Sequence, residues 1–227
     1  MFSGIIKEQG TVKSLGGGIL SVAAKNTCKN AYIGQSIAVN GICLTVKKII
    51  RPVLYFDYTP ATFKDSALKY LKINESVNIE PALSVNSDIS GHFVLGHIDG
   101  IGMITVKKRT GNSVIAGIKI INSIDADIKN YIIKKGSISI DGISLTVNET
   151  DGDTFFVSLI PLTYAETNLK FKTAGDFVNI ETDIIERTVV NRLKDTVLEP
   201  AGGGTEKRVP NAGGLTIEFL AENGFMK

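Results

Sequence analysis

The sequence has few of the residues that build disulfide frameworks or metal sites. Among its 227 residues are no tryptophan, two cysteines and two histidines. Cys28 and Cys43 are too few for a disulfide framework, which favours a reducing, cytoplasmic setting. With His92 and His97 they lack the spacing of a zinc site, so we expect no metal. No segment approaches the length of a membrane span, and the N-terminus lacks the pattern of a signal peptide.

A strong charge of either sign is also missing. The formal net charge is +2, with 43% hydrophobic and 21% charged residues, which is typical of soluble globular proteins. This balance argues against the basic surface of a nucleic-acid-binding protein. The sequence has no Gly-rich phosphate loop, no Gly-x-Ser-x-Gly motif and no dinucleotide fingerprint. The sequence therefore gives no motif support for a phosphate-loop enzyme, a nucleophile-elbow hydrolase or a dinucleotide-dependent enzyme.

The sequence does contain one pattern twice, at a constant spacing of 101 residues. Val-Asn-Gly-Ile-Cys-Leu-Thr-Val at residues 39–46 returns as Ile-Asp-Gly-Ile-Ser-Leu-Thr-Val at residues 140–147. The same spacing relates Pro60 to Pro161, Thr62 to Thr163, and Val-Asn-Ile-Glu at residues 77–80 to residues 178–181. A spacing shared by several motifs is hard to reach by chance, so we interpret it as an internal duplication of a small domain.

Each copy predicts short strands separated by turns. In the first copy we expect strands at residues 19–23, 36–39, 43–50, 53–58 and 76–79 and a helix at 62–71. In the second we expect strands at 102–107, 114–120, 137–140, 144–149, 154–159 and 177–180 and a helix at 163–169. Asn40-Gly41 and Asp141-Gly142, between apolar runs, predict hairpin turns. About six short strands and one helix per copy predict a small closed barrel.

The predicted fold is therefore all-β, with two duplicated six-stranded antiparallel Greek-key barrels, a short helix in each, and a C-terminal helix. We expect domains at residues 1–95 and 96–186, and a helix with a Gly-rich tail at 187–227. Ile185, Val189 and Leu193 are four residues apart, which predicts an amphipathic helix that docks on the core or on another subunit. The Gly-rich segment precedes a short apolar piece at residues 215–225, for which a helix is one option.

Repeated hydroxyl side chains are the first candidates for chemistry. Thr45 and Thr146 recur on matching strands, while Thr62 and Thr163 follow the paired prolines. If these side chains face inward at the barrel mouths, each barrel would hold one polar pocket. Strand threonines are just as often structural, and both interpretations stay open.

The second candidates are a cysteine and a histidine whose residue types are not repeated in the other copy. Cys43 corresponds to Ser144 in the other copy, and His97 follows the linker between the copies. A cysteine at such a position is a small buried residue or a nucleophile, and a lone histidine is structural or catalytic.

Four motifs in combination resemble the riboflavin synthase family over residues 1–193. They are the opening Met-Phe-Ser-Gly-Ile, Asn-Gly-Ile-Cys-Leu-Thr-Val at residues 40–46, two Gly-His pairs at 91–92 and 96–97, and residues 135–147. The resemblance implies two lumazine-binding barrels and a helix through which three chains assemble. It implies a transferase without metal or cofactor, acting in the last step of riboflavin biosynthesis. Two molecules of 6,7-dimethyl-8-ribityllumazine would exchange a four-carbon unit to give riboflavin and 5-amino-6-ribitylamino-2,4-pyrimidinedione. Lumazine synthase is a further candidate partner.

The resemblance also implies which residues form the site. The implied catalytic residues are Cys43, His97, Ser36, Thr146, Lys135 and Asp141. The implied first-barrel pocket contains Gly4, Ile5, Ile6, Ser36, Cys43, Thr45, Asp57, Tyr58, Thr59, Pro60, Ala61, Thr62 and His97. The implied second-barrel pocket contains Lys135, Asp141, Ser144, Thr146, Ile160, Pro161, Leu162 and Thr163. Leu44, Gly96, Ile98 and Leu145 complete the implied substrate-binding residues.

Two rival functions use similar barrels. The lumazine proteins bind a lumazine or a flavin without catalysis, and lack the cysteine, histidine and threonine that correspond to Cys43, His97 and Thr146. An oligonucleotide-binding barrel would need a basic face with exposed aromatic residues. The scattered aromatic residues and balanced charge of this chain disfavour it.

Overall fold

The computed structural model describes the backbone of residues 1–197 and the side chains of residues 1–193. The Gly-rich segment and the short apolar piece expected at residues 215–225 lie outside the described residues. In the part that is described, no helix combines the length and apolar character needed to cross a membrane.

The first copy folds into a closed antiparallel barrel with strand order β1-β2-β5-β4-β3-β6. Its strands are β1 (Glu8–Gly16), β2 (Ile19–Ala23), β3 (Ser36–Val39), β4 (Ile42–Ile50), β5 (Val53–Asp57) and β6 (Ser76–Pro81). A short helix, α1 (Thr27–Asn30), joins β2 to β3. The polar strand β1 carries no strong strand signal and was missing from the predicted set.

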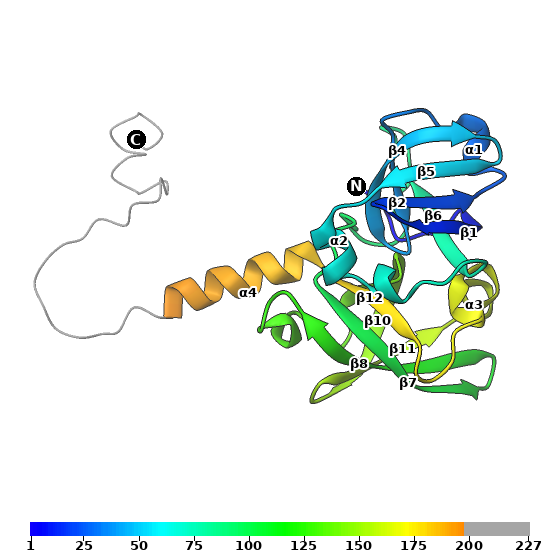
Figure 1. Ribbon diagram of the computed structural model, residues 1–227. Helices are drawn as coiled ribbons and strands as arrows, with labels where there is room; N and C mark the ends of the chain where they lie inside the picture. The colour runs from blue at the N-terminus through cyan, green and yellow to red at the C-terminus, as the bar shows by residue number, and fades with distance from the viewer. Residues whose placement is uncertain (198–227) are drawn as a thin grey trace, which may run out of the picture. The chain divides into compact units, whose positions relative to one another are not determined.

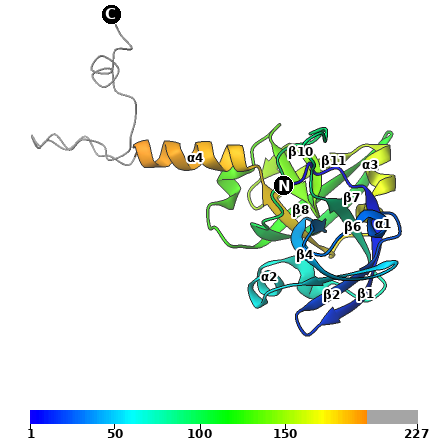
Figure 2. The ribbon, with the colours of Figure 1, turned by 90° about the horizontal axis from the view of Figure 1, so that it is seen from above.

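The second copy repeats this barrel strand for strand, in the order β10-β11-β8-β7-β12-β9. Its strands are β7 (Gly100–Thr110), β8 (Ser113–Ser123), β9 (Ser137–Ile140), β10 (Ile143–Asp151), β11 (Thr154–Leu159) and β12 (Phe177–Thr182). The 3-10 turn η2 (Ile128–Tyr131) leads into β9. Figures 1 and 2 show the first barrel in blue and cyan and the second in green and yellow. The predicted pair of six-stranded antiparallel barrels is confirmed.

The helix expected at residues 62–71 is wrong as one continuous element. The chain forms α2 (Pro60–Asp65) and then the 3-10 turn η1 (Ala67–Tyr70), separated by an extended Ser66 with φ −126° and ψ 169°. The Ser66 hydroxyl donates to the Thr62 carbonyl at 2.6 Å and accepts from the Leu68 amide at 3.3 Å. Such local side-chain bonds compete with a continuing helix. The second copy breaks at Thr167, between α3 (Pro161–Glu166) and η3 (Asn168–Lys170).

Strand alternation fixes which side chains fill each barrel. Along β4 the buried positions alternate, so Leu44 and Val46 pack into the first core around Phe56. The second core is built in the same way around Phe155. Because successive strand residues face opposite sides, Cys43 and Thr45 must point outward. Of the two interpretations left open for the strand threonines, the one that needs Thr45 and Thr146 to face inward is therefore not met.

The predicted C-terminal helix is present as α4 (Ile184–Val197). Ile185, Val189 and Leu193 are all exposed, so in the described chain the apolar stripe is not covered by the barrels. Docking of this stripe on the core, one of the two expected outcomes, is therefore not what this structure contains.

Candidate active site

A cavity on the outer face of the first barrel brings Cys43 and His97 together. It has a volume of about 240 Å³, and its lining combines β4, α2 and the segment that connects the barrels. The Cys43 amide donates to the Gly96 carbonyl at 2.9 Å, which places His97, the next residue, beside the thiol-bearing strand. The lining residues are Ile42, Cys43, Ala61, Thr62, Asp65, Ser66, Gly96, His97, Ile98 and Ile124.

Ser144 occupies the matching position on the second barrel. Its amide donates to the Gly4 carbonyl at 2.8 Å, and its hydroxyl lies 2.7 Å from Nδ1 of His92. The prediction that Gly4, Ile5 and Ile6 belong to the first-barrel pocket is wrong. Gly4 contacts Ser144, and Ile6 packs against the second core.

His92 is a site residue that the sequence did not single out. Its side chain is buried, and among the residues with described side chains none is a hydrogen-bond partner of Nε2. Burial lowers the pKa of His92 below its ordinary value of 6.5, against the opposing influence of the Asp183 carboxylate. The ring beside the Ser144 hydroxyl is therefore biased toward its neutral form. The signal that could have identified His92 is the repeated Gly-His pair at residues 91–92 and 96–97.

Cys43 and Ser144 are each contacted by a segment that belongs in sequence to the other barrel. Phe2 and Val94 form an antiparallel bridge, with amide-to-carbonyl distances of 2.7 and 3.1 Å. From this bridge, residues 2–6 run to the second barrel and residues 94–98 to the first; we call these two the crossing segments. Gly96 has φ +83°, and a Cβ there would lie 2.5 Å from that of Cys43. Gly4, with φ +75°, stands in the same relation to Ser144 at 2.6 Å.

The two hairpin turns meet back to back between the barrels. Asn40 and Asp141 have φ +46° and +47°, and a Cβ on Gly41 would lie 2.6 Å from the Gly142 amide nitrogen. Asn78 donates to the Asp141 carbonyl at 2.9 Å, and its repeat partner Asn179 donates to the Asn40 carbonyl at 2.8 Å. These reciprocal bonds fix the turns two or three residues before Cys43 and Ser144.

Asp141, an implied catalytic residue, lies within this junction. Its side chain is buried, accepts from the Asn179 amide at 2.8 Å and from Asn168 Nδ2 at 2.8 Å, and lies 3.7 Å from Lys172 Nζ. Burial raises the pKa of Asp141, while the nearby Lys172 ammonium opposes that change. With all these partners inside the junction, the geometry favours a structural role.

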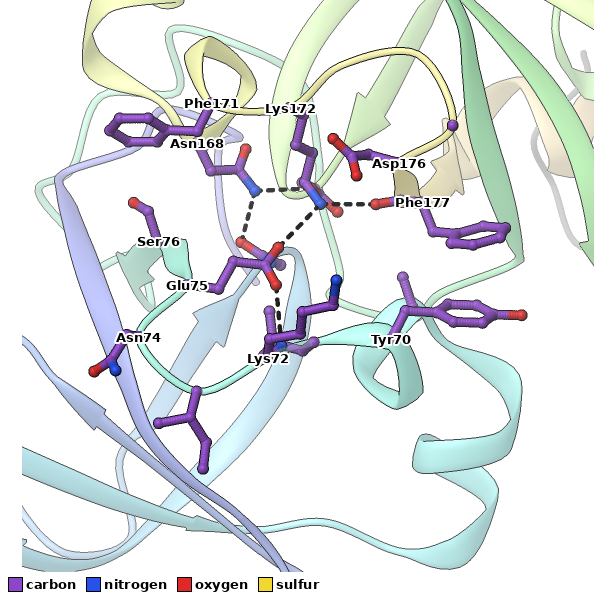
Figure 3. Close-up of a pocket in the computed structure, with 16 residues that line it drawn as sticks. Tyr70, Lys72, Asn74, Glu75, Ser76, Asn168, Phe171, Lys172, Asp176 and Phe177 are labelled. Atoms are coloured by element: carbon purple, nitrogen blue, oxygen red, sulfur yellow. Dashed lines mark hydrogen bonds and ion pairs between the residues drawn. The ribbon is translucent and has the colours of Figure 1, made fainter.

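A larger cavity of about 590 Å³ lies beside the junction (Figure 3). Lys172 Nζ donates to the Phe177 carbonyl at 2.8 Å and lies 3.6 Å from Glu75 Oε1. The Tyr70 ring stacks on Phe177 with centroids 3.9 Å apart. Neither Cys43 nor His97 lines this cavity, so it does not coincide with the predicted site.

The remaining implied residues fall into groups. Ser36 and Asp57 both pair with Thr45 across neighbouring strands, and Asp57 forms a 2.8 Å ion pair with Lys47. Lys135 is exposed, with φ +71°. Tyr58 and Thr59 precede α2, with Tyr58 stacked on Phe63, whereas Leu44 and Leu145 have their side chains in the two cores. On the second barrel, Ile160, Pro161, Leu162 and Thr163 form the start of α3, apart from the Cys43 cavity.

Comparison with known proteins identifies the family. The lumazine binding domain model matches residues 3–82 and 95–183. Riboflavin synthase of Actinobacillus pleuropneumoniae is 38% identical, over 99% of this chain and 100% of the relative. That of Bacillus subtilis is 36% identical with the same coverage. The crystal structure of LumP complexed with riboflavin has a TM-score of 0.71 at 26% identity, covering 80% of this chain and 99% of that one. LumP complexed with 6,7-dimethyl-8-(1'-D-ribityl) lumazine has a TM-score of 0.69 at 25% identity, with the same coverage. With two matched lumazine-binding domains and relatives aligned end to end, this chain belongs to the riboflavin synthase family.

Proposed function

We propose that this chain is a transferase that converts two molecules of 6,7-dimethyl-8-ribityllumazine into riboflavin and 5-amino-6-ribitylamino-2,4-pyrimidinedione. The observation that carries this function is the similarity to riboflavin synthases along the full chain. It is supported by the Cys43 cavity and its Ser144 counterpart, since a reaction between two copies of one molecule suits two related sites.

Holding the two substrates in register would supply much of the rate. A bimolecular encounter becomes effectively unimolecular, which is worth roughly 7–11 kcal/mol for well-oriented groups. The chain's contribution is therefore chiefly positional, with acid–base groups placed at the reacting carbons.

We assign the chemistry to Cys43, His97 and a nearby hydroxyl. His97, exposed in the cavity lining, removes a proton from the acidic 7-methyl group of one lumazine. Cys43 serves the addition of a nucleophile to carbon 7 of the other lumazine. Imidazole is suited to this step because its ordinary pKa is close to neutrality. Ser36, Thr146 and Lys135 are proposed to assist from the outer faces of the barrels.

The complete site is proposed to form between chains. In one chain, Ser144, Thr146 and Thr163 are not in the lining of the Cys43 cavity, and His97 is exposed to solvent. Packing the first barrel of one chain against the second barrel of its neighbour would cover His97 and exclude water. The exposed stripe of Ile185, Val189 and Leu193 on α4 supports assembly as a homotrimer. The proposal also includes a cytoplasmic location and an association with lumazine synthase. Its domain limits are residues 1–95, 96–186 and 187–227.

The test is a turnover assay without added cofactor. Purified protein is incubated with 6,7-dimethyl-8-ribityllumazine, and both products are quantified by chromatography. One riboflavin for every pyrimidinedione is the expected result. A lumazine that stays bound and unchanged would instead identify a binding protein of the LumP type, whose barrels are similar.

A further inference from the structure

Two glutamates that the proposed chemistry does not use occupy equivalent positions on β6 and β12. Glu80 and Glu181 are 2% and 3% exposed, although a carboxylate is costly to bury. Each side chain binds two consecutive backbone amides. Glu80 Oε1 and Oε2 accept from the amides of Ser3 and Gly4 at 2.7 and 3.0 Å.

Glu181 repeats this contact on the other crossing segment. Its Oε1 accepts from the Leu95 amide at 2.6 Å, and its Oε2 from the Gly96 amide at 3.0 Å. Two charge-assisted bonds to adjacent amides fix both the position and the direction of the backbone they hold.

The segment that each glutamate holds is bonded to the outer face of the opposite barrel. Glu181 belongs to the second barrel, yet Gly96 accepts from the Cys43 amide of the first and is followed by His97. Glu80 belongs to the first barrel, yet Gly4 accepts from the Ser144 amide of the second. Only one of the two crossing segments carries an imidazole, because Ile5 stands where the other has His97.

We propose that Glu181 is a positioning residue for the reaction, holding the crossing segment so that His97 lies over the Cys43 cavity. Glu80 is its matched partner and holds Gly4 and Ile5 against Ser144. This inference rests on the proposed function, but the placement of the segment can be measured without turnover.

The protonation state of Glu181 affects how firmly its carboxylate binds the Leu95 and Gly96 amides. Burial raises the pKa of Glu181 to about 7. The hydrogen bonds from the Leu95 and Gly96 amides and the charge of Arg187 lower this pKa, and the charge of Asp99 raises it. When protonated, one oxygen becomes a donor and no longer accepts from an amide. We therefore expect the hold on residues 94–98 to weaken as the pH falls through about 7.

The experiment compares Glu181→Gln with Glu80→Gln in the full chain. An amide side chain offers one acceptor oxygen and places an NH₂ group against a backbone N–H, so one of the two bonds is lost. The turnover number, KM for 6,7-dimethyl-8-ribityllumazine and the melting temperature are measured from pH 6 to 9. E181Q is expected to lower the turnover number at least tenfold and to make the wild-type decline around pH 7 less steep, leaving the part that comes from the imidazole base. E80Q is expected to change KM more than turnover.

Alkylation of Cys43 by iodoacetamide provides a readout that needs no activity. Loosening residues 94–98 should uncover the thiol, so E181Q is expected to react several-fold faster than wild type, and E80Q at the wild-type rate. Cys28 is buried and serves as the internal control. Glu181→Asp, which keeps the charge, should restore part of the protection and replaces E181Q if that variant does not fold.

A folded E181Q with wild-type turnover and wild-type alkylation would overturn the positioning role. So would equal effects of E181Q and E80Q on both readouts. If the wild type forms no riboflavin but E181Q still exposes Cys43, the proposed function fails and the positioning role stands.

Discussion

The two barrels share a scaffold and differ in their chemistry. Strand order, hairpin turns and the glutamate that holds a crossing segment are the same in both. The outward-facing positions differ, since Cys43 and His97 in the first pocket correspond to Ser144 and Ile5 in the second. A duplicated fold can therefore keep two similar outer surfaces while only one of them carries the pair proposed to react.

A second difference lies in the junction, where the second copy has a charge pair and the first has neutral residues. In the first copy Asn40 is accompanied by Leu71, which packs against the first core. In the second copy the equivalent residues are Asp141 and Lys172, 3.7 Å apart. Asp141 without Lys172 would be a buried carboxylate that has lost its cation, whereas Lys172 without Asp141 would keep Glu75 at 3.6 Å.

The largest expected effect comes from making the first pocket resemble the second. His97→Ile removes the imidazole and inserts the residue found at the equivalent position 5. Riboflavin formation should fall by roughly 10²–10⁴-fold, the usual range for loss of an acid–base group. Steady-state assays measure this, with Ile5→Val as the control; equal losses in both variants would contradict the assignment.

The next effect tests the charge pair at the junction. Lys172→Leu leaves Asp141 without its nearest cation and should lower the free energy of unfolding by about 3–5 kcal/mol. The double variant Asp141→Asn with Lys172→Leu recreates the first copy and should recover most of that loss. Urea denaturation of the two variants and of Asp141→Asn completes the cycle; additive losses would show that the two residues are not coupled.

A smaller effect is expected where the turns meet. Gly142 has φ +80°, and its Cβ would lie 2.7 Å from the Gly41 amide nitrogen, whereas Gly152 has φ +57° and open space around it. Gly152→Ala should cost only the left-handed backbone penalty of about 1–2 kcal/mol. Gly142→Ala adds a steric clash between backbones and should cost about 1–3 kcal/mol more. Thermal unfolding measures the loss of stability in both variants. Equal losses would show that the backbone at the junction relaxes without a steric penalty.

The smallest effect concerns the two histidines and pH. Because burial lowers the pKa of His92, the unfolded chain binds this proton more readily below pH 6.5. The contribution of His92 to stability is thus present above pH 6.5 and is lost as the pH falls. His92→Gln should flatten the acid decline in unfolding free energy, with His97→Gln as the comparison. Glu181 acts in the opposite direction, since its raised pKa makes the folded chain bind a proton between about pH 4.5 and 7. An acid decline in His92→Gln as steep as in the wild type would contradict this.

The fold could be predicted because its signals are local and repeated. The hairpin turns, the alternation around Leu44 and Leu145 and the constant spacing together specify two barrels. Strand β1 and the break at Ser66 escaped prediction, since they depend on pairing with β6 and on side-chain bonds to the backbone. The limits of the domains stay a prediction.

The site was harder to predict because the chain exchanges segments between barrels. Nothing in the composition around Gly4 says that it contacts Ser144, and the assignment of Gly4 to the first pocket was wrong for that reason. A weak second repeat existed, Gly-Ile-Ile at residues 4–6 against Gly-His-Ile at 96–98, with a spacing of 92 rather than 101. It is too short to be recognised without the structure.

The bridge between Phe2 and Val94 has a consequence for how the length of this chain can change. An extra residue between Phe2 and Gly4 or between Val94 and Gly96 would break the register between this bridge and the bonds to Ser144 or Cys43. The lengths of residues 2–6 and 94–98 are therefore coupled through one backbone bridge.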